Sequence, residues 1–173
     1  MSRPSTNKEG RVLKSLLIAG LLMSNASTAL AERPKLLKGT ASVIDGDTIE
    51  IHKQRIRLHG IDAPESRQPC WRDGKEWRCG PSAANALARK IGRASVTCEV
   101  KNYDRYKRAV ARCLKGDTDL GEWMVERGHA VAYPQYSKAY LPAEARARRA
   151  ERGLWTGEFE LPWEWRKAKN KKR

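Results

Sequence analysis

Short segments of alternating apolar and polar residues predict β-structure in much of the chain. Residues 39–45, 48–52 and 54–59 are rich in β-branched side chains, and their alternation is typical of strands with one buried face. Residues 95–115 are predicted to form a hairpin, and residues 130–133 a further brief strand. Five short strands of this kind fit an OB-type barrel.

Helical spacing of apolar residues predicts about three helices. The first runs from residue 81 or 82 to about 91, with a proline in its first turn and a glycine after its last. A short helix follows over residues 118–128, and a third covers roughly 142–152. Strands interrupted by helices, with a helix at the end, favour an α+β domain over a parallel α/β sheet. The chain has 173 residues and no internal repeat, so a single domain is expected.

The first 31 residues have the order of a secretory signal. Four basic residues come first, residues 15–23 (SLLIAGLLM) form a short apolar segment, and small residues lead up to Ala31. The alternative is a retained membrane anchor, but this apolar segment is far shorter than the roughly 20 residues that span a bilayer. The sequence therefore predicts a cleaved signal and no stable membrane insertion after cleavage.

The remaining chain is strongly basic. The whole sequence has a net charge of +15, and removal of residues 1–31 leaves +12. Such a surplus favours polyanionic partners. Nucleic acid, an anionic membrane and an acidic polysaccharide all qualify on charge alone. The C-terminal run RKAKNKKR is predicted to be a disordered, solvated end.

The four cysteines are expected to form two disulfides, because an even number is typical of exported proteins. None lies in a C-x-x-C motif, which disfavours a zinc site. A hairpin turn near residues 104–107 places Cys98 opposite Cys113, within reach of a cross-strand bridge. Cys70 and Cys79 would then close a polar loop.

Two pairs of carboxylates lie where predicted strands meet loops. Asp45 and Asp47 flank a glycine in IDGDT, and Asp62 and Glu65 follow in GIDAPE. Each residue alone is typical of a turn. If both segments leave the same edge of the sheet, however, the four carboxylates converge, and clustered oxygen ligands suit Ca²⁺ or Mg²⁺.

Converging carboxylates repel one another and raise their own pKa values unless positive charge balances them. Arg57, on the third predicted strand, and Arg108, after the hairpin turn, are candidates for that balance. The alternative is that they are two surface arginines among many.

Four ordered segments make the pattern specific: VIDGDTIEI, RIRLHGIDAPES, DRYKRAVARC and ERGHAVAY. In this order and spacing they resemble the staphylococcal nuclease family, from about Lys38 to Trp155. The resemblance implies a five-stranded OB-type barrel with helices. It also implies a metal-dependent nuclease that cuts DNA and RNA with Ca²⁺ and leaves 3′-phosphates.

The resemblance assigns metal ligands residue by residue. Asp47 and Asp62 are the implied direct ligands of Ca²⁺, and Ala63 donates its backbone carbonyl. Asp45 lies close by and supports the site without binding the ion directly. Ala63 stands where many members have threonine, which matters little if only its carbonyl binds.

The resemblance also assigns catalytic roles. Glu65 is the implied general base toward the attacking water, while Arg57 and Arg108 hold the scissile phosphate. Tyr106 and Tyr133 are candidates for binding the nucleotide, as is Tyr136.

The expected organisation is a signal peptide over residues 1–31, a nuclease domain over 36–160 and a basic tail over 161–173. The expected protein is a monomer, secreted or periplasmic, with DNA and/or RNA as its substrate. The alternative is a catalytically silent OB-type module that only binds nucleic acid. Silent relatives usually lose acids or arginines of the site, and this chain keeps them.

Overall fold

The computed structural model describes residues 35–171. The signal peptide expected over residues 1–31 lies outside this range. Within residues 35–171, no helix combines the length and the apolar character that a membrane span requires.

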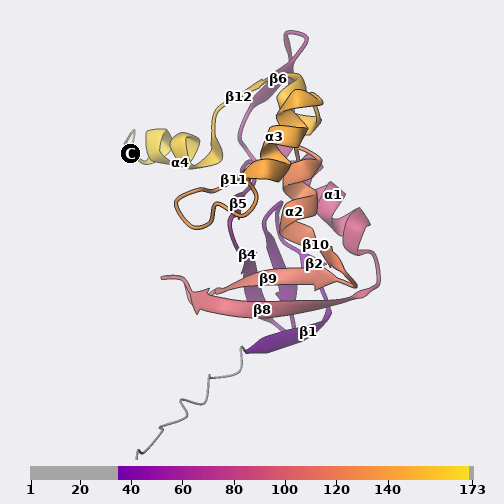
Figure 1. Ribbon diagram of the computed structural model, residues 1–173. Helices are drawn as coiled ribbons and strands as arrows, with labels where there is room; N and C mark the ends of the chain where they lie inside the picture. Colours follow the sequence, from indigo (N-terminus) through magenta and orange to yellow (C-terminus); the bar gives the residue numbers. More distant parts are fainter. Residues whose placement is uncertain (1–34, 172–173) are drawn as a thin grey trace, which may run out of the picture. The chain divides into compact units, whose positions relative to one another are not determined.

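A single curled sheet forms the centre of the fold (Figure 1). Its strands follow one another in the order β1-β8-β9-β4-β3-β2, and β10 pairs with β9 beside this path. All neighbours are antiparallel except β4 and β9. The strands are β1 (Leu36–Thr40), β2 (Ser42–Val43), β3 (Thr48–Ile51), β4 (Gln54–Leu58), β8 (Ser95–Tyr103), β9 (Ala109–Lys115) and β10 (Thr118–Asp119).

The sheet curls because its two end strands are consecutive in the sequence. β1 pairs with β8 at one end and β2 pairs with β3 at the other, yet only Ala41 separates β1 from β2. The predicted strand over residues 39–45 is therefore two short strands that belong to opposite ends of the path. A curled sheet inside an α+β domain agrees with the expected class, but this sheet has seven strands rather than five.

A two-residue turn joins β3 to β4. His52 and Lys53 both have positive φ, at 50° and 65°, the conformation that suits the twist of a tight hairpin. The turn sets the register that places Thr48 opposite Arg57 and buries Ile49 against Ile56.

The described residues form four α-helices where the sequence predicts about three. α1 (Cys79–Ile91) buries Ala83, Leu87 and Ile91, the stripe that its periodicity predicts. The side chain of Asp119 caps α2 (Leu120–Glu126) by accepting hydrogen bonds from two backbone N–H groups. The remaining helices are α3 (Leu141–Arg149), the 3₁₀ helix η1 (Gly153–Thr156) and α4 (Pro162–Lys171).

The expectation of a disordered basic end is wrong over α4. Proline is the first residue of this helix, and Trp163 stacks on Tyr133 with ring centroids 4.8 Å apart and an interplanar angle of 4°. The basic composition of this segment predicted a solvated tail. The prediction failed because the aromatic contact that holds the helix forms only in the folded chain.

Two disulfides join Cys70 to Cys79 and Cys98 to Cys113, the pairs expected from the sequence. The second links β8 to β9 at directly opposed positions. The segment between the first pair is a hairpin rather than an irregular loop, and a third strand extends it into a small sheet. The strands of this sheet are β6 (Cys70–Arg72), β7 (Lys75–Trp77) and β12 (Glu158–Phe159), and a separate pair is formed by β5 (Ile61–Asp62) and β11 (Val131–Ala132).

Candidate active site

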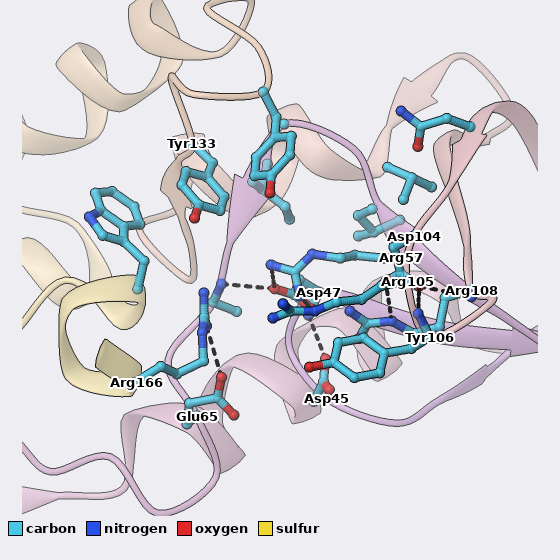
Figure 2. Close-up of a pocket in the computed structure, with 18 of the residues that line it drawn as sticks. Asp45, Asp47, Arg57, Glu65, Asp104, Arg105, Tyr106, Arg108, Tyr133 and Arg166 are labelled. Atoms are coloured by element: carbon cyan, nitrogen blue, oxygen red, sulfur yellow. Dashed lines mark hydrogen bonds and ion pairs between the residues drawn. The ribbon is translucent and has the colours of Figure 1, made fainter. Parts of the chain in front are cut away.

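A cleft of about 880 Å³ brings together acids, arginines and aromatic side chains from distant parts of the sequence (Figure 2). One wall is the turn between β8 and β9, and the other includes α4. The floor comes from the β2–β3 turn, β4 and the segment after β5. Nine residues proposed from the sequence line it: Asp45, Asp47, Arg57, Ala63, Glu65, Tyr106, Arg108, Tyr133 and Tyr136.

The stretch between β2 and β3 is a turn that fixes Asp47. The N–H groups of Ile44 and Asp45 both donate to the carbonyl of Thr48, at 2.9 and 3.2 Å. The Asp47 N–H then donates to Oδ1 of Asp45 at 3.0 Å, and the Thr48 hydroxyl donates to Oδ1 of Asp47 at 2.9 Å. Asp45 thus supports the turn while the carboxylate of Asp47 enters the site.

Gly46 lets this turn approach its neighbours. A Cβ at this position would lie 2.7 Å from the Cβ of Ala63 and 2.8 Å from that of Ala83. Because such distances are shorter than carbon atoms tolerate, a side chain would push the turn away from the segment after β5 and from α1.

Arg57 connects the two predicted metal-binding aspartates. Its Nη2 lies 3.0 Å from Oδ2 of Asp47 and 2.6 Å from Oδ1 of Asp62, and its Nη1 donates to Oδ1 of Asp47 at 3.2 Å. The Asp62 side chain has no exposed area, so it lies beneath the cleft rather than on its surface. The guanidinium is therefore held in one orientation by two carboxylates.

Arg166 of α4 is a member of the site that sequence reasoning missed. Its Nη1 donates to Oε1 of Glu65 at 2.8 Å, and its Nη2 donates to Asp62 at 2.8 and 3.1 Å. Figure 2 shows it beside Glu65, at the side of the cleft away from Arg108. The available signal was the helical spacing of Trp163, Arg166 and Lys167 in a segment that begins with proline.

Arg108 occupies the opposite wall and is held by Asp104. Its Nε donates to Oδ2 of Asp104 at 2.8 Å, and Oδ1 of the same carboxylate accepts from the N–H groups of Arg108 and Tyr106. Lys107 completes the turn at φ 61°, a conformation that glycine adopts most readily. The ring of Tyr106 is exposed, with the Arg105 and Arg108 guanidinium groups 5.1 and 5.6 Å from its centre.

Negative charge is concentrated at the floor of the cleft. Burial, followed by the charge of Asp47, raises the pKa of Asp45 to about 6. Burial also raises the pKa of Asp62, although two arginines oppose that shift. Burial therefore disfavours the charged forms of Asp45 and Asp62, and a bound cation would favour them.

The donor atoms at this floor fit a hard cation. The carboxylates of Asp47 and Asp62 both lie against the same nitrogen of Arg57, and Ala63, whose N–H donates to Oδ2 of Asp47 at 3.3 Å, follows Asp62 directly. Oxygen donors of this kind suit Ca²⁺ or Mg²⁺ with water completing the coordination. Across residues 35–171 no group of three or more His, Cys, Asp or Glu residues is arranged for a metal, so the protein would supply few side-chain ligands.

Comparison with known proteins identifies the class. The family model described as "Staphylococcal nuclease homologue" matches residues 55–157. The succinoglycan biosynthesis protein ExoI of Rhizobium meliloti (strain 1021) is 38% identical over 148 residues, which cover 83% of this chain and 75% of that protein. An uncharacterized endonuclease of Escherichia coli O157:H7 is 34% identical over 135 residues, covering 73% of this chain and 82% of that protein.

A rice protein extends the similarity to plants. The probable staphylococcal-like nuclease CAN3 of Oryza sativa subsp. japonica is 36% identical over 124 residues, or 70% of this chain, but the match spans only 30% of the rice protein. The curled α+β fold and its acid–arginine cleft thus define a staphylococcal-nuclease-like domain. The chain belongs to the staphylococcal nuclease family.

Proposed function

We propose that this protein is a Ca²⁺-dependent endonuclease that hydrolyses phosphodiester bonds of DNA and/or RNA and leaves 3′-phosphates. The observation that supports the proposal most is the convergence of Arg57, Glu65 and Arg108 on one cleft. Relatives named as nucleases agree with this chemistry.

The arginines bind the scissile phosphate and stabilise the charge that develops on it. Both carry paired donors and remain charged at any physiological pH. Arg57 is oriented by Asp47 and Asp62, and Arg108 by Asp104, so neither needs to reorganise during the reaction. Preorganised donors of this kind usually supply the largest part of catalysis.

Glu65 accepts the proton of the attacking water. Its side chain is partly exposed in the cleft and one of its oxygens is held by Arg166, which fixes its direction. Water attacks phosphorus in line with the departing oxygen. A Ca²⁺ ion held by Asp47, Asp62 and the Ala63 carbonyl would supply further charge stabilisation at the phosphate.

A silent nucleic-acid-binding module is the competing function. Such a module needs positive charge and stacking surfaces, which this chain has, but it does not need a carboxylate beside two oriented arginines. The presence of Glu65 together with Arg57 and Arg108 in one cleft favours the enzyme. Tyr106 and Tyr133 are proposed to contact the nucleotide in either case.

The same proposal includes the setting in which the enzyme acts. Two disulfides suit an oxidising environment, so a secreted or periplasmic location is proposed, together with a monomeric state.

The test is digestion of single-stranded DNA and of RNA with Ca²⁺, with EDTA, and by the Glu65→Gln variant. Glu76→Gln, an exposed glutamate on β7 outside the cleft, is the matched control. The expected result is cleavage that EDTA abolishes, a loss of about 10²–10⁴-fold in the Glu65 variant, and normal cleavage by the control. Activity that survives both EDTA and Glu65→Gln would overturn the mechanism, and binding without cleavage would establish the silent module.

Product ends are tested separately. Fragments from a labelled oligonucleotide should resist 3′-extension by a polymerase until a phosphatase is added. Fragments that extend without phosphatase would refute the 3′-phosphate assignment while leaving the nuclease itself intact.

A further inference from the structure

One face of α4 forms part of the cleft. Trp163, Arg166, Lys167 and Asn170 all line it, at the i, i+3, i+4, i+7 spacing of a single helix face. The family match ends at residue 157, before this helix begins. Hence α4 adds to the site a surface that lies outside the matched segment.

The position of α4 is fixed by contacts at several points. Trp163 stacks on Tyr133, and Arg166 pairs with Asp62 and Glu65. The segment before the helix is also held, because the Gln68 side chain donates to the carbonyl of Glu160 at 2.6 Å and β12 pairs with β6. Lys167 and Asn170 are therefore presented at fixed places along the cleft.

The chemistry of the free end of this face suits nucleic acid. The Lys167 side chain is 81% exposed, and its one ion-pair partner among residues 35–171 is Glu164, at 3.8 Å. Asn170 is exposed one turn further along. An ammonium group next to a side-chain amide can pair with a phosphate and with a base edge or sugar.

The two walls of the cleft carry the same sign of charge. Arg105 and Arg108 lie on the β8–β9 turn, and Arg166 and Lys167 lie on α4, with the acids between them. A volume of about 880 Å³ is near the upper end of the range for pockets that hold whole small molecules, so it exceeds what one phosphate requires. A strand that crosses the cleft would meet cations on both sides of the reacting phosphate.

We propose that the cleft face of α4 is a binding subsite for a nucleotide that flanks the scissile bond of a single-stranded nucleic acid. Lys167 pairs with the phosphate of that nucleotide, and Asn170 contacts its sugar or base. This inference rests on the proposed nuclease function. If α4 instead blocked the cleft, removal of its cleft-facing side chains would strengthen binding of the strand and not weaken it.

The experiment compares Lys167→Ala with Lys169→Ala. Both changes remove one lysine from the same helix, but Lys169 lies over the Trp165 ring and does not line the cleft. The dissociation constant of a fluorescent 12-nucleotide single strand is measured by anisotropy in EDTA at several salt concentrations. The value of KM in Ca²⁺ is then measured for the same strand and for a dinucleotide without terminal phosphates, whose single phosphate is the scissile one.

A single-strand phosphate contact contributes about 0.7 to the slope of log affinity against log salt concentration. If the wild type and the variant bind equally well near 1 M salt, the loss of one such contact weakens binding about fivefold at 0.1 M salt. Lys167→Ala should therefore weaken binding of the 12-nucleotide strand about fivefold and lower the slope by about 0.7. It should raise KM for that strand by a similar factor and leave the dinucleotide unaffected. Lys169→Ala should change these values much less.

Equal losses in the two variants, or unchanged affinity in Lys167→Ala, would overturn the subsite. Tighter binding by Lys167→Ala would overturn it in favour of a blocking helix. If the wild-type protein cuts neither substrate, the nuclease proposal fails, but the anisotropy measurement in EDTA still decides whether α4 binds the strand.

Discussion

Replacement of Arg166 by glutamine should destabilise the protein and, at the same time, make it respond more strongly to Ca²⁺. In the native protein Arg166 donates to Asp62 and Glu65, and the Asp62 side chain is fully buried. Arg57 still balances Asp62 in the variant, and Arg166 is about one third exposed, so the cost is well below that of an isolated buried charge. We expect the free energy of unfolding without Ca²⁺ to fall by about 1–2 kcal/mol.

The response to Ca²⁺ has the opposite sign. The guanidinium group of Arg166 lies against Asp62 and repels a cation that binds to the same carboxylate. A decrease of about 1.4 kcal/mol in this repulsion corresponds to a tenfold increase in the affinity for the cation. With Arg166 replaced, Ca²⁺ should bind about tenfold more tightly. At saturating Ca²⁺, the difference in the free energy of unfolding between the variant and the wild type should therefore shrink by about 1.4 kcal/mol.

The assay is thermal unfolding followed by tryptophan fluorescence, in EDTA and over a Ca²⁺ titration. The expected fall in Tm without Ca²⁺ is about 3–8 °C for a domain of this size, and the gap to wild type should narrow as Ca²⁺ is added. Arg149→Gln is the control, since Arg149 is exposed on α3 and the described residues give it no ion pair. A Tm difference that stays constant at all Ca²⁺ concentrations would refute the claim that Arg166 and Ca²⁺ share the carboxylate of Asp62. An unchanged Tm would show that the ion pairs of Arg166 do not stabilise the protein.

Three further changes test the supports of the site. Asp104→Asn should lower kcat/KM for single-stranded DNA about tenfold, because the arginine of the β8–β9 turn loses its charged partner; unchanged kinetics would show that the arginine is positioned without it. Replacement of Cys98 and Cys113 by alanine should lower the urea-derived free energy of unfolding by about 3 kcal/mol, the value for a loop of this length, and a loss below 1 kcal/mol would contradict the estimate. Gly80→Ala would bring a Cβ within steric overlap of the Glu65 carbonyl, so it should displace that loop and reduce kcat more than it reduces DNA binding; the reverse order would contradict this.

The sequence predicted those strands and helices whose signals lie within their own segments of the chain. The β3–β4 hairpin has a two-residue turn and a clear alternation, and α1 has a buried stripe and suitable end residues. The spacing of Cys98 and Cys113 around one turn likewise contained the information needed to pair them. The two acidic segments were also expected to meet, and Asp47 and Asp62 do so at Arg57. The expected shared edge is absent, however, because Asp62 belongs to β5 of a separate two-stranded sheet.

The missed features depend on contacts between distant segments. Nothing local to Arg166 shows that it reaches Asp62, because 104 positions separate them and the contact requires the stacking of Trp163 on Tyr133. The hairpin between Cys70 and Cys79 similarly gains its third strand from residues 158–159. A basic composition predicted solvation for the last helix, whereas folding gave one of its faces a place in the cleft.

The most direct test of the proposed active site is the single-turnover rate of cleavage of a labelled single-stranded oligonucleotide in Ca²⁺ by wild type and by Arg57→Ala. Arg57 lies between the two buried aspartates at the floor of the cleft, so its loss should remove phosphate stabilisation and disturb both carboxylates. The proposed active site predicts cleavage by the wild type and a rate at least about 10²-fold lower in the variant, with the variant still folded by circular dichroism. A folded Arg57→Ala protein that cuts at the wild-type rate, or a wild-type protein that does not cut, would contradict it.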